Sequence, residues 1–243
     1  MKLLSVCIIA ALLTGASCKT AKQTVTKESV VTNPVISKPA VAGNIKKTDQ
    51  AIRIRIITDS GSMIVKLYDS TPLHRDNFVK LVTQGFYDSL MFHRVIPGFM
   101  IQGGDPLSKN APPSIMLGNG GDNMARIPAE FRQTLRHKRG VLAAARDGNP
   151  LKASSACQFY IVDGKTYTDS DLDMMESRKG FKYSISEREI YKSMGGTPSL
   201  DMEYTVFGEL ESGLEIISKI AMAPRDANNR PLGDVRMRME IIK

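Results

Sequence analysis

The amino-acid sequence predicts a mostly β domain with a few short helices, and three features of its apolar pattern carry this prediction. Apolar and polar residues alternate over residues 52–56 and again over residues 235–241, as in strands with one buried face. Helical spacing occurs only in short stretches, at residues 78–82 and 214–220. Strands and helices do not alternate regularly along the chain, which disfavours a doubly wound parallel sheet.

The folded domain is expected to cover residues 51–243, and its predicted elements follow in order. The first strand turns at residues 59–61 and continues into a second apolar stretch, which predicts a β-hairpin. One short helix ends before Gly85, and another begins after Gly213. Because half-buried strands bracket the domain at both ends, the pattern favours a closed sheet.

Residues 1–17 are predicted to be a signal peptide. One lysine precedes an apolar run over residues 3–13, which is too short to span a membrane. Residues 15–18 resemble a bacterial lipoprotein cleavage site, in which Cys18 becomes the lipidated first residue. We therefore expect a membrane-anchored lipoprotein in the periplasm. The alternative is an ordinary signal peptide with a chance cysteine, which would give a soluble periplasmic or secreted protein.

Residues 18–50 are predicted to be the lipidated cysteine and a flexible tether, because they contain no aromatic residue and no sustained periodicity. The formal net charge is +8, yet residues 51–243 hold 26 Lys and Arg against 23 Asp and Glu. The basic character thus lies largely in the tail, and no nucleic-acid partner is expected. Removal of the signal peptide leaves only Cys18 and Cys157, so no disulfide framework is expected.

The stretch MFHRVIPGFMIQGGDP, residues 91–106, places an arginine and a glutamine inside an apolar, glycine-rich run. Taken one at a time, these residues fit two buried strands joined by a Pro–Gly turn. As a block, residues 92–105 match the pattern F-H-R-x-I-P-G-F-M-x-Q-G-G-D throughout. The chain thereby resembles the cyclophilins, a family of peptidyl-prolyl cis-trans isomerases, from about Ile52 to Ile242.

This resemblance implies a fold and an activity. Cyclophilins are closed eight-stranded antiparallel β-barrels capped by two helices, with a groove on the outer face for a proline-containing peptide. The expected activity is rotation of X-Pro bonds, here in exported or periplasmic proteins. No cofactor is expected, because no covalent bond is made or broken.

The resemblance assigns catalytic roles to Arg94, Phe99 and Gln102. A twisted prolyl amide has a pyramidal nitrogen with a lone pair, so a donor aimed at that nitrogen stabilises the transition state more than the planar ground state. Arg94 is the expected donor because it is permanently charged. Gln102 would orient the guanidinium or the substrate carbonyl, and Phe99 would contact the proline ring.

The substrate-binding residues that the resemblance implies are Met100, Ala145, Arg146, Gln158, Tyr160, Leu200 and Tyr204. Three of them depart from the usual family residues, since Arg146 replaces Asn, Tyr160 replaces Phe and Tyr204 replaces His. Both tyrosines keep an aromatic wall, so activity is expected to survive. The chain has no tryptophan, and Ser199 stands where many members have one.

Residues 165–197 are inserted where many cyclophilins have a short loop. Residues 168–171 and 184–187 both fit the capping pattern S/T-x-x-D/E, and Gly180 and Gly195 lie where each helix would end. We therefore expect a helical hairpin. We favour a hairpin that only packs on the surface over one that binds substrate or a partner.

Rival motifs in the sequence are weak. The glycine-rich residues 118–121 lack the strand, the spacing and the downstream acid of a dinucleotide site. His74, His93 and His137 share no ligand spacing, so no metal is expected.

Two functions stay open at this point. The first is an isomerase that acts on exported proteins, and the second is a chaperone or adaptor that binds proline segments with little turnover. Retention of Arg94, Phe99 and Gln102 together favours the isomerase.

Overall fold

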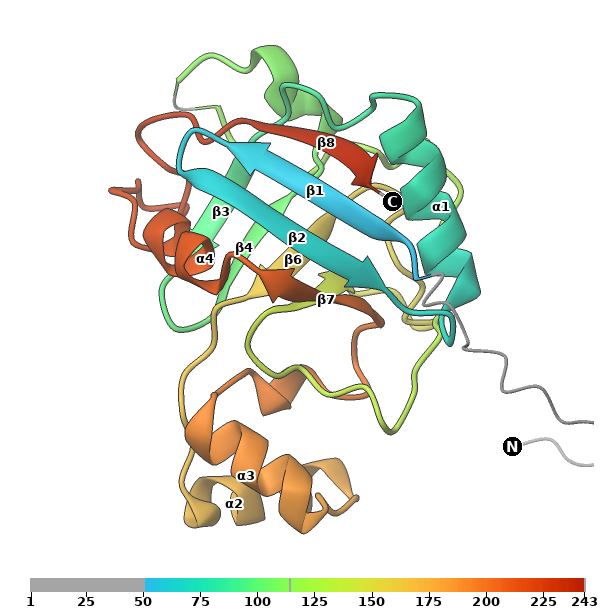
Figure 1. Ribbon diagram of the computed structural model, residues 1–243, viewed down its shortest axis with the longest axis vertical. Helices are drawn as coiled ribbons and strands as arrows, with labels where there is room; N and C mark the ends of the chain where they lie inside the picture. Colours follow the sequence, from blue (N-terminus) through green and yellow to red (C-terminus); the bar gives the residue numbers. More distant parts are fainter. Residues whose placement is uncertain (1–50, 114, 243) are drawn as a thin grey trace, which may run out of the picture. The chain divides into compact units, whose positions relative to one another are not determined.

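A computed structural model describes residues 51–113 and 115–242, which form eight β-strands and four α-helices (Figure 1). The strands are β1 (Arg53–Thr58), β2 (Gly61–Leu67), β3 (Phe92–Ile96), β4 (Met100–Gly103), β5 (Val141–Ala144), β6 (Phe159–Val162), β7 (Val206–Ser212) and β8 (Met237–Ile242). They form one antiparallel sheet in the order β3-β4-β6-β5-β7-β2-β1-β8. The predicted signal peptide and tether lie outside the described residues.

The hairpin of β1 and β2 forms as predicted, because its apolar residues fall on one face of the sheet. Ile54 and Ile56 are fully buried, and Thr58 pairs with Gly61 across the turn. Gly61 has a φ of 137°, which a side chain would strain, and a Cβ there would collide with Ile216. On its other edge β1 pairs with β8, which confirms the C-terminal strand.

The sheet curls into an open half-barrel, so the expected closed barrel is not what the structure shows. Strands β3 and β8 are its two edges. Two backbone N–H groups of β3 donate to carbonyls in the loop before β8, Phe92 N to Val235 O and Val95 N to Asn229 O, both at 2.9 Å. Next to them, Ser89 and Leu90 bond to Met237 and one isolated bridge joins Met91 to Arg236, but β3 and β8 themselves are not paired as strands.

The two faces of the curled sheet carry separate apolar clusters. On the inner face, Phe78, Tyr87, Phe159 and Phe207 form an aromatic core with ring centroids 5.1–5.6 Å apart. On the outer face a second cluster includes Met100, Val141, Ala143, Tyr160 and Val206. Because neighbouring strand residues point to opposite faces, Phe159 packs inward while Tyr160 packs outward. The outer cluster is the surface on which the candidate site is built.

Two helices, α1 (Pro72–Thr83) and α4 (Leu214–Ala221), cover the sheet. Helix α1 contacts β7 and β8, whereas α4 contacts β2, β3 and β4. The sequence predicted both, although α1 begins six residues before the predicted stretch. Glu130 explains this early start, because its carboxylate accepts hydrogen bonds from the backbone N–H groups of Leu73 and His74 at 3.2 and 3.0 Å. Over residues 51–113 and 115–242, none of the helices has the length and apolar character needed to cross a membrane.

The segment 165–197 contains the two remaining α-helices, α2 (Asp169–Lys179) and α3 (Ile185–Ser193), side by side and set apart from the strands in Figure 1. Both predicted capping boxes are present, at Thr168 and Ser184. Gly180 ends α2 with a left-handed backbone, as predicted. Helix α3 is capped by Met194, and the predicted Gly195 follows directly with a φ of 84°.

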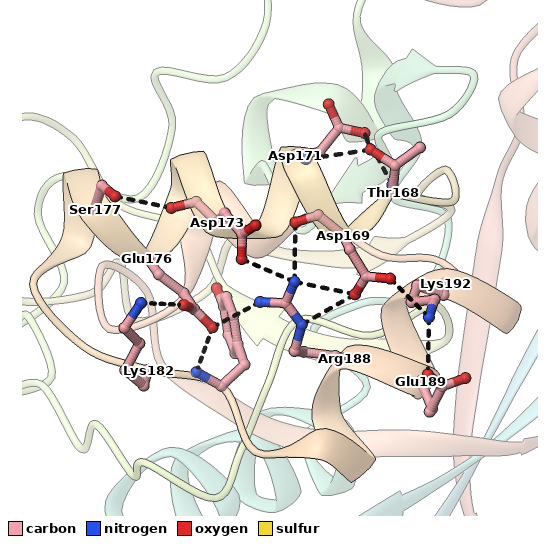
Figure 2. A network of polar contacts seen from close by, with 11 residues as sticks. Thr168, Asp169, Asp171, Asp173, Glu176, Ser177, Lys182, Arg188, Glu189 and Lys192 are labelled. Carbon is pink, nitrogen blue, oxygen red and sulfur yellow. Dashed lines mark hydrogen bonds and ion pairs between the residues drawn. The ribbon is translucent and has the colours of Figure 1, made fainter.

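This insertion has its own small hydrophobic core, and ion pairs join its two helices. Leu172, Tyr183 and Tyr191 are buried together. Figure 2 shows Arg188 of α3 reaching across to α2, where its guanidinium pairs with Asp169, Asp173 and Glu176 at 2.9–3.0 Å.

The insertion also leaves and rejoins the sheet at one place. Lys165 and Gly196 exchange backbone hydrogen bonds of 3.2 and 2.9 Å. Residues 166–195 therefore form a segment whose two ends lie side by side.

Candidate active site

The β3–β4 hairpin holds Arg94 and Gln102 directly opposite each other. The Arg94 guanidinium donates to Gln102 Oε1 at 3.2 Å and lies 6.0 Å from the centre of the Phe99 ring. Both polar residues lie on the outer face of the sheet, partly buried beside the outer apolar cluster. This placement explains why a strand pair with a buried inner face carries an arginine and a glutamine.

A chain of hydrogen bonds fixes the orientation of this pair. Gln158 Nε2 donates to the backbone carbonyls of Gly118 and Gly120, both at 2.9 Å, so its Oε1 is left to face Gln102. Gln102 Nε2 donates to that oxygen at 3.1 Å, and its own Oε1 then accepts from Arg94. The loop at residues 118–120 thereby sets the position of the guanidinium through two amides.

Next to the guanidinium is a small pocket of about 90 Å³. Nine of the ten site residues predicted from the sequence line it, namely Arg94, Phe99, Met100, Gln102, Ala145, Arg146, Tyr160, Leu200 and Tyr204. The tenth, Gln158, lines an adjoining cavity of about 470 Å³ that shares Gln102, Ala145 and Arg146 with the pocket. The structure therefore brings all ten residues to one surface.

Tyr160 forms much of the apolar floor of the pocket together with Met100, and both are buried. The Tyr160 ring meets that of Tyr204 edge to face, with the centroids 5.8 Å apart. Burial raises the pKa of Tyr160 well above its usual value, so its hydroxyl stays protonated. The extra hydroxyl, compared with phenylalanine, is bonded below the pocket to His137 Nε2 at 2.9 Å.

Arg146, the residue that departs from the usual asparagine, is held at the rim of the pocket. Its guanidinium donates to the Glu203 backbone carbonyl at 2.9 Å and to the Glu203 carboxylate at 3.3 Å, and it stacks 4.6 Å from the Tyr204 ring centre. A hydrogen bond from Lys152 holds the pKa of Glu203 below its usual value, which keeps this partner ionised. Glu203 carries no signal of this role in the sequence, because no local pattern links it to a residue 57 positions away.

His93 and Ser199 lie close to the pocket without lining it. His93 is 3% exposed, and among residues 51–113 and 115–242 neither of its ring nitrogens has a hydrogen-bond partner. Burial lowers its pKa to about 4, so it is neutral beside Arg94 at neutral pH. Ser199, proposed to stand at the tryptophan position, is exposed and follows Pro198 in the short turn that carries Leu200.

A Ser–His–Glu arrangement occurs elsewhere in the domain, and its burial argues against hydrolysis. Glu130 Oε2 lies 2.7 Å from His74 Nδ1, and His74 Nε2 lies 3.0 Å from Ser154 Oγ. Ser154 is 1% exposed, so a substrate cannot reach its hydroxyl. The three residues tie α1 to two distant loops instead.

Within residues 51–113 and 115–242, no group of three or more His, Cys, Asp or Glu side chains could hold a metal ion.

Comparisons with known proteins agree with this geometry. A family model described as cyclophilin-type peptidyl-prolyl cis-trans isomerase/CLD matches residues 53–240. The chain is a cyclophilin-family member. A Staphylococcus haemolyticus protein with the provisional name of peptidyl-prolyl cis-trans isomerase is 34% identical over 190 residues, which cover 77% of this chain and 89% of that protein. A Staphylococcus aureus protein with the same name is 33% identical over 208 residues, covering 83% and 93%.

Other relatives place the cyclophilin domain in longer proteins. A Streptococcus pyogenes protein, provisionally named a bifunctional phosphatase and peptidyl-prolyl isomerase, is 35% identical over 190 residues, but the match covers only 37% of its length. Among solved structures, the cyclophilin-type isomerase of Cryptosporidium parvum superimposes with a TM-score of 0.59 at 26% identity. That match covers 79% of this chain and 98% of the solved one.

Proposed function

We propose that this cyclophilin catalyses cis-trans rotation of X-Pro peptide bonds. The observation that carries the proposal is an oriented guanidinium beside an apolar pocket, with the chain Arg94–Gln102–Gln158 fixing its direction. The proline ring would occupy the pocket over Met100 and Tyr160. Its amide nitrogen would then face the guanidinium.

The chemistry in this arrangement is electrostatic and needs no nucleophile. Rotation of an amide breaks its resonance against a barrier of roughly 18 to 20 kcal/mol. As the bond twists, the proline nitrogen regains its lone pair, and Arg94 would donate a hydrogen bond to it. Because Arg94 is already held by Gln102, little reorganisation is needed during rotation.

We also propose that the substrates are exported proteins and that the protein is a lipoprotein facing the periplasm. This proposal rests on the sequence of residues 1–18, in which an apolar run precedes Cys18. The partners would be proline-containing segments of exported or periplasmic proteins, and the membrane through the lipid. A soluble periplasmic or secreted protein is the alternative.

The second candidate function is a chaperone or adaptor that binds proline segments without meaningful turnover. The shared feature would be the apolar pocket, and the difference would be the use of Arg94. A protein that only binds has little use for a fixed cation aimed at the proline nitrogen.

The deciding experiment is an NMR exchange measurement on a short Ala-Ala-Pro-Phe peptide with the purified full-length protein. Catalysis would give exchange cross-peaks between the cis and trans forms on a timescale of milliseconds to seconds, against tens of seconds or longer without enzyme. Binding-induced shifts without faster exchange would instead favour the chaperone or adaptor.

A further inference from the structure

Asp201 is a fully buried carboxylate at the junction between the helical insertion and the pocket. Its Oδ1 accepts hydrogen bonds from the backbone N–H and from Nδ1 of His137, at 2.7 and 2.9 Å. Its Oδ2 accepts from the hydroxyls of Tyr191 and Tyr183, at 2.6 and 2.9 Å. One side chain thus receives two donors from the sheet side and two from the insertion.

These bonds fix the ionisation state of Asp201. Burial raises its pKa, but the hydrogen bonds from His137 and Tyr191 outweigh burial and bring the pKa below its usual value. An ionised carboxylate only accepts, so His137 Nδ1 must carry the proton. On the other side of the ring, His137 Nε2 lies 2.9 Å from the Tyr160 hydroxyl, a hydrogen-bond distance whichever of the two atoms donates. A continuous chain of hydrogen bonds therefore connects the insertion to the pocket floor.

The backbone around Asp201 carries two more walls of the pocket. Leu200 precedes it in the turn η2 (Pro198–Leu200), and Tyr204 closes the turn with a bond from its N–H to the Leu200 carbonyl at 3.3 Å. The insertion also holds this backbone directly, because Lys179 Nζ donates to the Asp201 carbonyl at 2.8 Å. The positions of Leu200 and Tyr204 thus depend on how Asp201 is held.

Contacts inside the insertion hold the two tyrosines that reach Asp201. Tyr183 N donates to Glu176 Oε1 at 3.0 Å, and Arg188 clasps the same carboxylate, as Figure 2 shows for the arginine. Tyr183 and Tyr191 pack edge to face, with their centroids 5.4 Å apart. The two hydroxyls that reach Asp201 are therefore held by both the helices and the small core of the insertion.

We propose that Tyr183 and Tyr191 are positioning residues for the proline pocket, acting through Asp201 on Leu200, Tyr204 and Tyr160. The inference rests on the proposed function, and it gives a role in substrate binding to an insertion whose sequence favours a packed surface feature. Arg94 lies outside this hydrogen-bond chain, so the effect falls on binding of the proline segment more than on the rotation step.

The test is the double substitution Tyr183→Phe with Tyr191→Phe in the full-length protein, which removes two hydroxyls and keeps both rings. The matched control is Tyr167→Phe, because Tyr167 packs against the same small core and sends no hydrogen bond to Asp201 in the described structure. We expect the double variant to raise KM for the Ala-Ala-Pro-Phe peptide about threefold to tenfold, with kcat within about twofold. The control should leave both constants within about twofold.

A spectroscopic measurement separates positioning from a general loss of stability. In protein labelled with 13C at tyrosine Cζ, the Tyr160 resonance reports the hydrogen bond of its hydroxyl. We expect this resonance to move in the double variant and to stay in place in the control. A double variant with a lower melting temperature but an unchanged KM and an unchanged Tyr160 resonance would overturn the proposal.

Two provisions keep the test decisive. If the double variant does not fold, Tyr183→Phe and Tyr191→Phe are measured singly against the same criteria. If the wild-type protein shows no turnover, the proposed function fails, but peptide affinity from NMR titration and the Tyr160 resonance still decide the positioning role.

Discussion

Arg94 is the residue on which the proposed chemistry depends most directly. Its partner Gln102 holds it at the pocket, and no other described cation lines that pocket except Arg146, which Glu203 engages. We expect Arg94→Ala to lower kcat for the peptide by about one to three orders of magnitude, since it removes the only donor aimed at the proline nitrogen in this proposal. Peptide affinity, measured by titration, should change much less.

The control for this prediction is Arg238→Ala, which removes an arginine on β8 whose side chain is 59% exposed and does not line the pocket. Its kcat should equal that of the wild-type protein. Unchanged turnover in a folded Arg94→Ala variant would refute the proposed mechanism.

His93 allows a prediction of how folding stability depends on pH. Burial lowers its pKa from 6.5 to about 4, so between these values the unfolded chain binds a proton that the folded chain does not. Its contribution to stability is therefore complete above pH 6.5 and is lost as the pH falls toward 4, by at most about 1.4 kcal/mol per pH unit. We expect His93→Gln to lose less stability than the wild-type protein between pH 7 and pH 5.

Urea unfolding of both proteins at the two pH values measures this difference. His74, whose pKa burial also lowers, is present in both proteins and cancels in the comparison. Equal losses of stability would mean that the folded His93 ring titrates near its ordinary value.

At the scale of elements, the sequence correctly predicted the features that depend on residues close together in the chain. The β1–β2 hairpin follows from strict alternation and a glycine turn, and the caps of α2 and α3 follow from residues three positions apart. The start of α1 was missed because its N-terminal cap is Glu130, more than fifty residues away. The open edge between β3 and β8 was missed because strand alternation does not report how a sheet closes.

Glu130 provides a prediction about how much the N-terminus of α1 contributes to stability. It is 7% exposed and accepts hydrogen bonds from two N–H groups of α1 and from His74 Nδ1. Replacing it with alanine leaves these buried donors without an acceptor, which should lower the free energy of unfolding by about 2 to 4 kcal/mol. Glu130→Gln keeps one acceptor oxygen and should cost clearly less.

Urea or thermal unfolding of the two variants tests the capping role. An alanine variant as stable as the glutamine variant would show that water or another group satisfies the α1 terminus.

At the scale of the whole molecule, the sequence predicted which residues line the site better than it predicted which residues hold them in place. Ten residues from β3, β4, β6 and the segments between strands could be assigned to one surface because they belong to a recognisable pattern. The anchor Asp201 and its partner His137 were not assigned, although Tyr160 gave a signal, since a buried hydroxyl needs a partner. Such partners come from distant segments, and the sequence does not state which ones meet.

The lipid anchor is the prediction that concerns the chain as a whole, and it falls outside the described residues. If Cys18 is acylated, its chains add membrane affinity of about 0.8 kcal/mol per buried CH₂. The full-length protein should then enter the detergent phase on Triton X-114 partition, and Cys18→Ala should release it into the aqueous phase. Cys157→Ala is the matched control, because Cys157 is buried in the domain and inaccessible to acylation. Aqueous partition of the wild-type protein with a free thiol at Cys18 would refute the anchor and leave the soluble periplasmic or secreted form.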